Sequence, residues 1–288
     1  RRGIRFVELL DQQVFEEQIR AIMDEKNFYL EHYLKSDTVD PEAVIAAYRG
    51  YADRLRPYVD NVSVAIDRAI KAGRQILFEG AQGTHLDIDH GTYPFVTSSN
   101  TVSANACSGA GIGPRHISGV TGIVKAYTTR VGAGPFPTEL FDAVGDHIQA
   151  KGAEFGATTG RRRRCGWLDT VIVRNAVRLN GLTGLAITKL DVLGELDEIK
   201  VCDGYDYNGE TLTEFPTDLK VLAQCRPIYE TLPGWQTDIS AIRAREDLPA
   251  NALRYLERIE TLTQTPVDII SVGPGRDQTI VLENMLAR

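Results

Sequence analysis

Residues 184–191 read Gly184-Leu185-Ala186-Ile187-Thr188-Lys189-Leu190-Asp191, an apolar run of strand length that ends in charged side chains. A second such run, residues 267–272, ends in Ser271-Val272 and is followed by Gly273-Pro274. Amphipathic helical patterns precede these runs, over 169–181 with Asp169 as a cap and over 249–262. Helices that alternate with apolar strands predict an α/β fold with a central, mostly parallel sheet.

The remaining patterns predict three regions along the chain. Asp11 and Asp40-Pro41-Glu42 are expected to start two helices, and a third should cover 62–72 and stop at Gly73, giving a helical lobe over 1–73. Residues 74–130 are expected to hold later strands of the central sheet, beginning with 75–79, and the substrate loops. Residues 131–288 form a predicted C-terminal α/β portion, with a last strand at 279–282.

Composition restricts the class of protein. The 288 residues are 43% hydrophobic and 25% charged, a globular balance, and the net charge of −7 disfavours a nucleic-acid-binding role. No apolar run approaches the roughly 20 residues that cross a bilayer, so we expect a soluble protein. The four cysteines form no CxxC pair, which favours reduced cytosolic thiols. The chain begins at Arg1 without a signal-peptide pattern, and we interpret this as an internal start.

A glycine-rich passage from Gly80 to Pro114 is read as a functional loop rather than a linker, because its polar residues are varied. Within it, His85 and His90 flank Asp87 and Asp89. This spacing raises the possibility of a metal site. The alternation over 86–89 also fits a short half-buried strand, and we favour that interpretation over metal binding.

Four consecutive arginines, Arg161 to Arg164, follow Ala157-Thr158-Thr159-Gly160. A solvated basic turn and a nucleic-acid contact are both possible interpretations. Neither explains the threonines and the glycine. Guanidinium forks, hydroxyls and loop amides together suit a small substrate that carries carboxylates or phosphates, and this is the interpretation we favour.

The polar residues after each strand predict a base-binding pocket. In such sheets ligands bind outside the carboxyl ends of the strands. Asp191 there could accept hydrogen bonds from N1–H and the 2-amino group of guanine, donors that adenine lacks in this arrangement, while the stem of Lys189 lies along the base. The turn at 271–273 could complete the pocket, although an ordinary strand-ending turn fits it equally well.

Long consecutive blocks resemble one family, the adenylosuccinate synthetases. The blocks are Glu79 to Thr84, Asp87 to Thr101, Lys125 to Glu139, Gly156 to Arg164 and Gly166 to Asp169. The resemblance spans essentially the whole chain. It implies a GTP-dependent ligase of the AMP branch of purine nucleotide biosynthesis, which forms adenylosuccinate from IMP and L-aspartate with Mg²⁺. GTP first phosphorylates the 6-oxygen of IMP, and the aspartate amine then displaces phosphate.

The resemblance also implies roles for individual residues. Gln82 would act at the purine of IMP near the reacting 6-position. The other expected contacts are Arg1, Thr97, Val131 and Arg161 for IMP; Ala157, Thr158, Thr159, Gly160, Arg161, Arg162 and Arg163 for aspartate, as a loop that closes over it; and Arg163, Lys189, Leu190, Asp191, Ser271, Val272 and Gly273 for GTP. Arg1 is expected to cross to the IMP site of the partner subunit in a cytoplasmic homodimer.

Three features of the family have no match in this sequence. They are the glycine-rich phosphate loop, the aspartate that acts as base and binds Mg²⁺, and the histidine acid. Asp89, His90 and Lys125 are not taken as substitutes, so no metal ligands are expected in this chain and the fragment alone is expected to be inactive. The alternatives are a guanine-nucleotide-binding module built on Asp191 and an anion- or nucleic-acid-binding fragment. The ligase hypothesis requires Asp191 and Arg161 to lie on the same side of the molecule.

Overall fold

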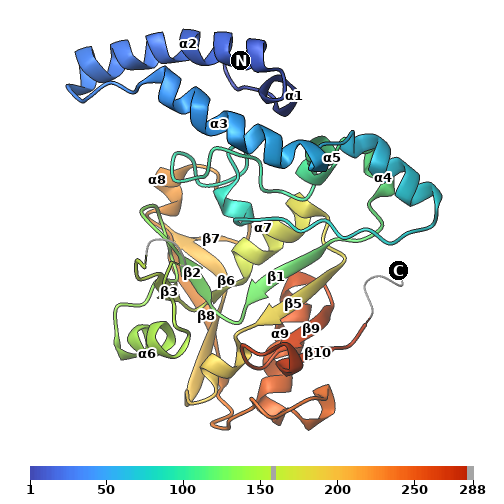
Figure 1. Cartoon of the computed structure of the whole chain (residues 1–288). Coiled ribbons are helices and arrows are strands. Elements are labelled where there is room, and N and C mark those ends of the chain that lie inside the picture. The colour runs from blue at the N-terminus through green and yellow to red at the C-terminus, as the bar shows by residue number, and fades with distance from the viewer. Residues whose placement is uncertain (157–159, 284–288) are drawn as a thin grey trace. The chain divides into compact units, whose positions relative to one another are not determined.

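The computed structural model describes residues 1–156 and 160–283 and divides the chain into two compact units, Arg1–Lys71 and Ala72–Arg288 (Figure 1). The first unit is helical, and the second contains the sheets. The further division of the second part at residue 130 stays a prediction. None of the described helices is long and apolar enough to cross a membrane.

The helical unit consists of α1 (Phe6–Leu9), α2 (Gln12–Tyr29), a π-helical turn η1 (Leu30–Leu34), α3 (Pro41–Leu55), η2 (Arg56–Tyr58) and α4 (Val62–Lys71). Its two long helices begin at the predicted caps. The carboxylate of Asp11 accepts the N–H of Val14 at 3.2 Å, and that of Asp40 accepts the N–H of Glu42 at 2.9 Å. Each cap satisfies an amide that has no partner inside its helix, which explains where the helices start.

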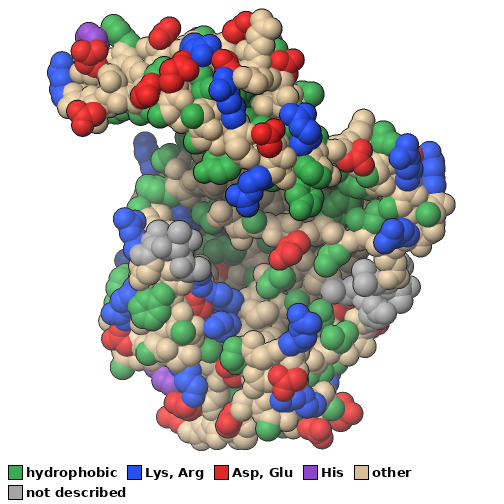
Figure 2. Space-filling view, viewed as in Figure 1, with side chains coloured by type: hydrophobic (Ala, Val, Ile, Leu, Met, Phe, Trp, Pro, Cys, Tyr) green, Lys and Arg blue, Asp and Glu red, His purple; other side chains and the backbone are tan. Residues whose placement is uncertain are grey.

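Helices α2 and α3 pack through a small apolar core of Phe15, Ile19 and Ile45, all buried. Beside this core Glu16 on α2 pairs with Arg49 on α3. In the view of Figure 2, acidic and basic side chains are interspersed over the outer surface of this unit. The small core and the mixed charges are what two amphipathic helices produce when each buries one stripe.

The main sheet of the second unit has the strand order β1-β5-β9-β10, formed by Thr121–Lys125, Gly184–Thr188, Val267–Ser271 and Thr279–Val281. Strands β1, β5 and β9 are parallel, and β10 is antiparallel to β9. Leu185, Ile187 and Ile270 are fully buried in its core. The prediction of a mostly parallel sheet carried by the runs at 184–188 and 267–271 is confirmed.

A second sheet was not anticipated. It joins β4 (Leu168–Asp169), β6 (Glu198–Tyr207), β7 (Glu210–Leu212) and β8 (Arg226–Pro233), and β6 is antiparallel to both β7 and β8. A two-stranded ribbon pairs β2 (Thr128–Arg130) with β3 (Arg164–Gly166). The available signal was the alternation of charged and apolar residues over 198–201, since a strand with one covered face alternates with period two.

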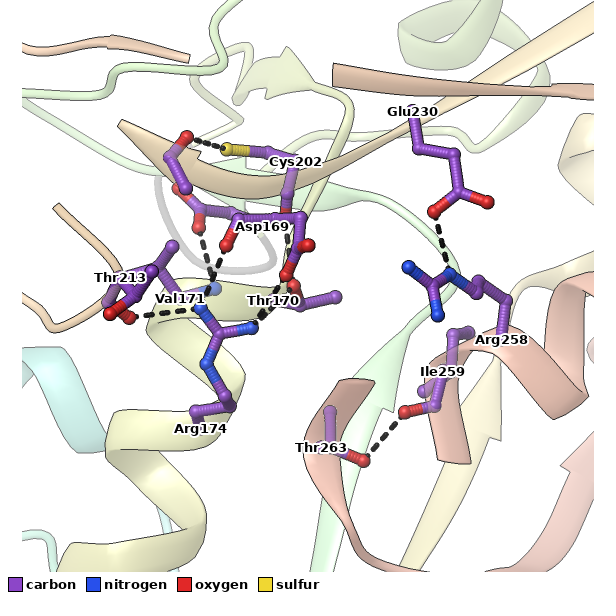
Figure 3. Close-up of polar contacts among 12 residues, drawn as sticks. Asp169, Thr170, Val171, Arg174, Cys202, Thr213, Glu230, Arg258, Ile259 and Thr263 are labelled. Carbon is purple, nitrogen blue, oxygen red and sulfur yellow. Dashed lines mark hydrogen bonds and ion pairs between the residues drawn. The ribbon is translucent and has the colours of Figure 1, made fainter. Parts of the chain in front are cut away.

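The helices of this unit are α5 (Asn105–Ala110), α6 (Ala143–Lys151), α7 (Thr170–Asn180), α8 (Leu219–Leu222) and α9 (Ala250–Thr263), with 3₁₀ turns η3 (Thr84–Leu86), η4 (Pro114–His116), η5 (Leu190–Leu193), η6 (Arg245–Asp247) and η7 (Arg276–Gln278). Helix α7 contacts both β1 and β6, so it connects the two sheets. Its predicted cap is confirmed: the carboxylate of Asp169 accepts the N–H groups of Val171 and Ile172, as Figure 3 shows for Val171.

Polar contacts fix α7 against the second sheet (Figure 3). The hydroxyl of Thr170 donates to the carbonyl of Cys202 at 2.7 Å. Arg174 donates to the carboxylate of Asp203 at 3.0 Å and to the carbonyl of Thr213 at 2.9 Å. These bonds join α7 to β6 and to the residue that follows β7.

Two predicted strands are wrong. Residues 75–79 are not a strand, and Leu77 is 78% exposed. No strand within the described ranges pairs with this segment, and an apolar run without a ladder partner does not form a strand. Residues 86–89 likewise form turns, because the buried carboxylate of Asp87 accepts four backbone N–H groups and curls the chain around itself.

Candidate active site

The carboxyl ends of β1, β5 and β9 meet at one edge of the main sheet. Lys125 at the end of β1 is in register with Thr188 at the end of β5, and Ile187 is in register with Ile270 of β9. The residues that directly follow these strands are therefore neighbours. This is the edge at which ligands bind in α/β sheets.

Lys189 and Asp191 leave β5 in a tight turn. Lys189 has a left-handed backbone (φ 62°), and the turn η5 starts at the next residue. Burial raises the pKa of Asp191, whose side chain is half-buried. The ammonium of Lys189 donates to the carbonyl of Gly152 at 2.9 Å. Asp191 therefore lies at the predicted sheet edge, while the lysine is directed toward the end of α6.

The turn after β9 lies beside this segment. The hydroxyl of Ser271 donates to the carbonyl of Gly273 at 2.8 Å, and the N–H of Val272 donates to the carbonyl of Gln278. A Cβ on Gly273 would lie 2.4 Å from the side chain of Gln278. The backbone at Gly273 therefore lies close to the side chain of Gln278 in η7. The structure thus brings the 189–191 and 271–273 segments to one edge, as predicted.

Glu154, which follows α6, is a fully buried carboxylate at this edge. Its Oε1 accepts from the hydroxyl of Tyr127 at 2.6 Å, and its Oε2 accepts from Nη1 of Arg163 at 2.8 Å. Nζ of Lys125 donates to both oxygens at 2.8 Å. Burial alone would raise the pKa of Glu154, but hydrogen bonds from Lys125, Tyr127 and Arg163 outweigh it and lower the pKa. Glu154 is therefore ionised.

The four arginines divide into two pairs. Arg161 and Arg162 are exposed, and Arg162 forms a surface pair with Asp146 at 3.2 Å. Arg163 forms an ion pair with Glu154. Arg164 instead pairs with Glu139, and its Nε donates to Oε1 of that residue at 2.7 Å. The interpretation of this run as a solvated basic turn holds for only half of it. Ala157, Thr158 and Thr159, predicted to bind aspartate, lie outside the described residues.

A short two-stranded ladder carries this run. The N–H of Gly156 donates to the carbonyl of Arg161 at 2.8 Å, and the N–H of Arg163 donates to the carbonyl of Glu154 at 2.9 Å. Gly160 has a left-handed backbone (φ 63°), a conformation that favours glycine. Arg161 therefore lies on the same ladder as Arg163, two residues before the residue that contacts Glu154.

The 189–191 segment and the arginine run lie on one side of the sheet. Lys189 contacts Gly152, and two residues further Glu154 contacts Arg163. This chain of contacts places Asp191 and Arg161 near the same edge, which is the arrangement that the ligase hypothesis requires.

The glycine-rich passage is ordered around Asp87. This carboxylate is fully buried and accepts from the backbone N–H groups of residues 89, 90, 101 and 102. Burial opposes its ionisation, but these amides outweigh it and lower the pKa of Asp87 to about 2. Thr97 is placed by its N–H, which donates to the carbonyl of Leu86 at 2.9 Å. The passage is thus ordered by specific hydrogen bonds, and its predicted functional role stays a prediction.

His85 fixes this loop to α7. Nδ2 of Asn175 lies 3.0 Å from Nε2 of His85, and the imidazole lies against the ring of Phe215 with centroids 4.6 Å apart. Burial, with a contribution from Arg130, lowers the pKa of His85 to about 4. The ring is neutral and structural. Among the described residues, no group of three His, Cys, Asp or Glu side chains could hold a metal ion.

Arg130 and Arg164 hold the segment that carries Val131. Nη2 of Arg130 donates to the hydroxyl of Thr92 at 2.9 Å, and Nη1 of Arg164 donates to the carbonyl of Gly134 at 2.9 Å. Val131 itself is exposed. The backbone at Val131 is therefore braced from both sides, next to the loop that holds Thr97.

Gln82 and Arg1 are the remaining predicted residues. Gln82 is exposed and has a left-handed backbone (φ 71°), an uncommon conformation for a residue other than glycine. Arg1 is exposed in the helical unit. Neither is joined to the sheet-edge residues by a described contact.

Cys165 packs beside the arginine run. Cys165 is buried and donates to the carbonyl of Arg163 at 3.6 Å, and burial raises its pKa to about 11. It is a packing residue with a protonated thiol. Sequence reasoning missed Glu154 and Tyr127, although Glu154 lies seven residues before the first of the four arginines.

Comparisons with known proteins agree on one family. A family model described as Adenylosuccinate synthetase matches residues 1–280. A curated Adenylosuccinate synthetase from Desulfatibacillum aliphaticivorans is 63% identical over 287 residues, covering 100% of this chain and 67% of the relative. One from Desulforapulum autotrophicum is 61% identical, covering 99% of this chain and 66% of the relative. The chain thus spans about two thirds of the length of these relatives.

A solved structure, that of a fully ligated adenylosuccinate synthetase from Plasmodium falciparum, superimposes with a TM-score of 0.93. It is 36% identical in sequence, and the match covers 98% of this chain and 67% of that chain. The likeness therefore includes both the sequence blocks and the arrangement of the elements.

Proposed function

The chain belongs to the adenylosuccinate synthetase family of GTP-dependent ligases in purine biosynthesis, and we propose that it supplies the substrate-binding part of the reaction that joins L-aspartate to IMP. The observation that carries this proposal is the meeting of three segments at one sheet edge: Lys189 to Asp191, Ser271 to Gly273, and the ladder with Arg161 and Arg163.

In this proposal Asp191 reads guanine. Its carboxylate accepts hydrogen bonds from N1–H and the 2-amino group, and its half-buried position makes an unmatched base costly. Lys189, Leu190, Ser271, Val272 and Gly273 complete the pocket. Arg163 reaches the phosphates of GTP, with a guanidinium already oriented by Glu154.

IMP lies against the ordered loop in this proposal. Gln82 contacts the purine near the 6-position, Thr97 binds the 5′-phosphate and the backbone of Val131 meets the ribose. Arg161 contacts IMP and grips a carboxylate of aspartate, and Arg162 and Gly160 line the aspartate site with the residues at 157–159. Arg1 reaches the IMP site of the partner subunit in a cytoplasmic homodimer.

The family generally uses Mg²⁺. The described residues offer no cluster of metal ligands, so we assign no step of the reaction in this chain to the metal. What these residues do is bind and orient. Positioning and charge neutralisation supply most of the catalysis in phosphoryl transfer, so a chain that fixes all three substrates contributes directly to rate.

The test is Asp191→Asn in the full-length protein. An amide offers one donor and one acceptor, so it matches the N1–H and 2-oxo groups of xanthine instead of guanine. We expect KM for GTP to rise about 30- to 100-fold, the value of one or two charge-assisted hydrogen bonds, with KM for IMP unchanged and with XTP accepted.

Initial rates with GTP, XTP and IMP measure this directly. Equal losses for GTP and IMP, or no gain with XTP, would contradict the base-reading role. Wild-type protein that forms no adenylosuccinate from the three substrates would overturn the ligase assignment and leave the guanine-binding module as the alternative.

A further inference from the structure

Glu154 is the best-satisfied ionised side chain at the sheet edge. Both of its oxygens accept two hydrogen bonds: Oε1 from Tyr127 and Lys125, and Oε2 from Arg163 and Lys125. Removing a fully buried carboxylate from water is costly unless donors replace that water. Four hydrogen bonds fix the orientation of the Glu154 carboxylate, and they also fix the three side chains that donate them.

The partners of Glu154 come from different parts of the sequence. Lys125 ends β1, Tyr127 follows it, and Arg163 lies on the other strand of the short ladder. The ladder also joins Glu154 and Arg163 through their backbones, since the N–H of Arg163 donates to the carbonyl of Glu154 at 2.9 Å. Arg163 is therefore fixed to the same residue twice, once by its backbone and once by its guanidinium.

Two cations, Lys125 and Arg163, share the single carboxylate of Glu154, so this three-residue cluster carries one net positive charge. Burial lowers the pKa of Lys125, and the contact with Glu154 opposes that effect. The side chains of Lys125 and Arg163 remain 25% and 29% exposed, so each presents part of its surface outward. The surplus of positive charge favours an anionic ligand at this place.

We propose that Glu154 is a positioning residue that holds Arg163 and Lys125 in place for the triphosphate of GTP. It touches no substrate itself. Its carboxylate keeps two cations next to each other that would otherwise repel, and it orients the guanidinium toward the nucleotide. The proposal rests on the proposed function, because that assigns GTP to this edge.

The main variant is Glu154→Gln in the full-length protein. Glutamine keeps the volume and an acceptor for Tyr127 but removes the charge that pairs Lys125 with Arg163. We expect the dissociation constant for GTP to rise about tenfold, while that for guanosine, which lacks phosphates, changes less than about twofold. KM for IMP should also stay within about twofold. Equilibrium binding and initial rates measure these quantities.

A matched control separates this role from general loss of an ion pair. Glu230 accepts from Nε of Arg258 at 2.6 Å, between β8 and α9 (Figure 3). Glu230→Gln removes a similar pair elsewhere, and we expect it to leave GTP and guanosine affinity unchanged. If Glu154→Gln and Glu230→Gln lower the affinity for GTP equally, Glu154 has no specific positioning role.

A second variant covers the possibility that Glu154→Gln unfolds the protein. Glu154→Asp keeps the charge, but its side chain is one methylene too short to reach both cations. We therefore expect the affinity for GTP to fall about three- to fivefold and the affinity for guanosine to stay unchanged. Unchanged GTP affinity in both variants, or equal losses for GTP and guanosine, would overturn the inference alone. If the wild-type protein does not bind GTP, the proposed function fails, and the inference fails with it.

Discussion

Asp87 and Glu154 are both fully buried carboxylates, but different donors hold them. Asp87 accepts backbone N–H groups from a loop close to it in sequence, whereas Glu154 accepts from three side chains, two on the segment that ends β1 and one on the arginine run. In both cases burial opposes ionisation and hydrogen bonds restore it. The difference shows two uses of a buried carboxylate. Asp87 fixes the path of a loop through its backbone N–H groups, whereas Glu154 fixes the positions of charged side chains that can contact a ligand.

The largest effect should come from Asp87→Ala, which tests the first half of this comparison. The substitution leaves four backbone amides without their acceptor, so we expect the free energy of unfolding to fall by about 3–5 kcal/mol. Urea denaturation measures it. Asp89→Ala is the control, because Asp89 is exposed and should cost about 0.5 kcal/mol. Similar losses for both variants would show that Asp87 does not organise the loop.

Acid should weaken the same loop through His85. Its pKa is about 4 in the folded protein and about 6.5 when unfolded, so the unfolded state binds the extra proton first. The free energy of unfolding is therefore highest above pH 6.5 and falls by up to about 3 kcal/mol as the pH decreases toward 4. Unfolding midpoints across this range measure the loss.

His85→Gln should flatten that acid profile, because glutamine retains an acceptor for Asn175 and does not titrate. His90→Gln serves as the control, since His90 is exposed. A profile that keeps its full slope in His85→Gln would assign the acid sensitivity to other groups and break the link between this histidine and the loop.

The smallest effect sharpens the second half of the comparison. Tyr127→Phe removes one neutral donor from Glu154 and leaves both cations in place. We expect a loss of about 1 kcal/mol in stability and less than a threefold change in GTP affinity. Tyr205→Phe is the matched control, because Tyr205 donates at 2.6 Å to the buried Asp169, away from the sheet edge. Tyr205→Phe should lower the stability without changing the affinity for GTP. A larger change in GTP affinity in Tyr205→Phe than in Tyr127→Phe would contradict the assignment of Tyr127 to the sheet edge.

Much of the architecture was readable from local pattern. The caps at Asp11, Asp40 and Asp169 and the strands at 184–188 and 267–271 depend on neighbouring residues, so sequence alone located them. The strand predicted at 75–79 failed because a strand also needs a partner. The second sheet was missed although β6 and β7 form a hairpin around Asn208-Gly209, a turn signal that the sequence itself carries.

The candidate site divides in the same way. The sequence alone located the Thr188-Lys189-Leu190-Asp191 motif, the arginine run, the glycine-rich loop and the family they resemble, because each is a consecutive pattern. Only the tertiary structure decided which arginines face inward and that Lys125, Glu154 and Arg163 form one cluster. The physical reason is that a buried ion must be matched by donors in space, and those donors come from whichever elements the fold brings together.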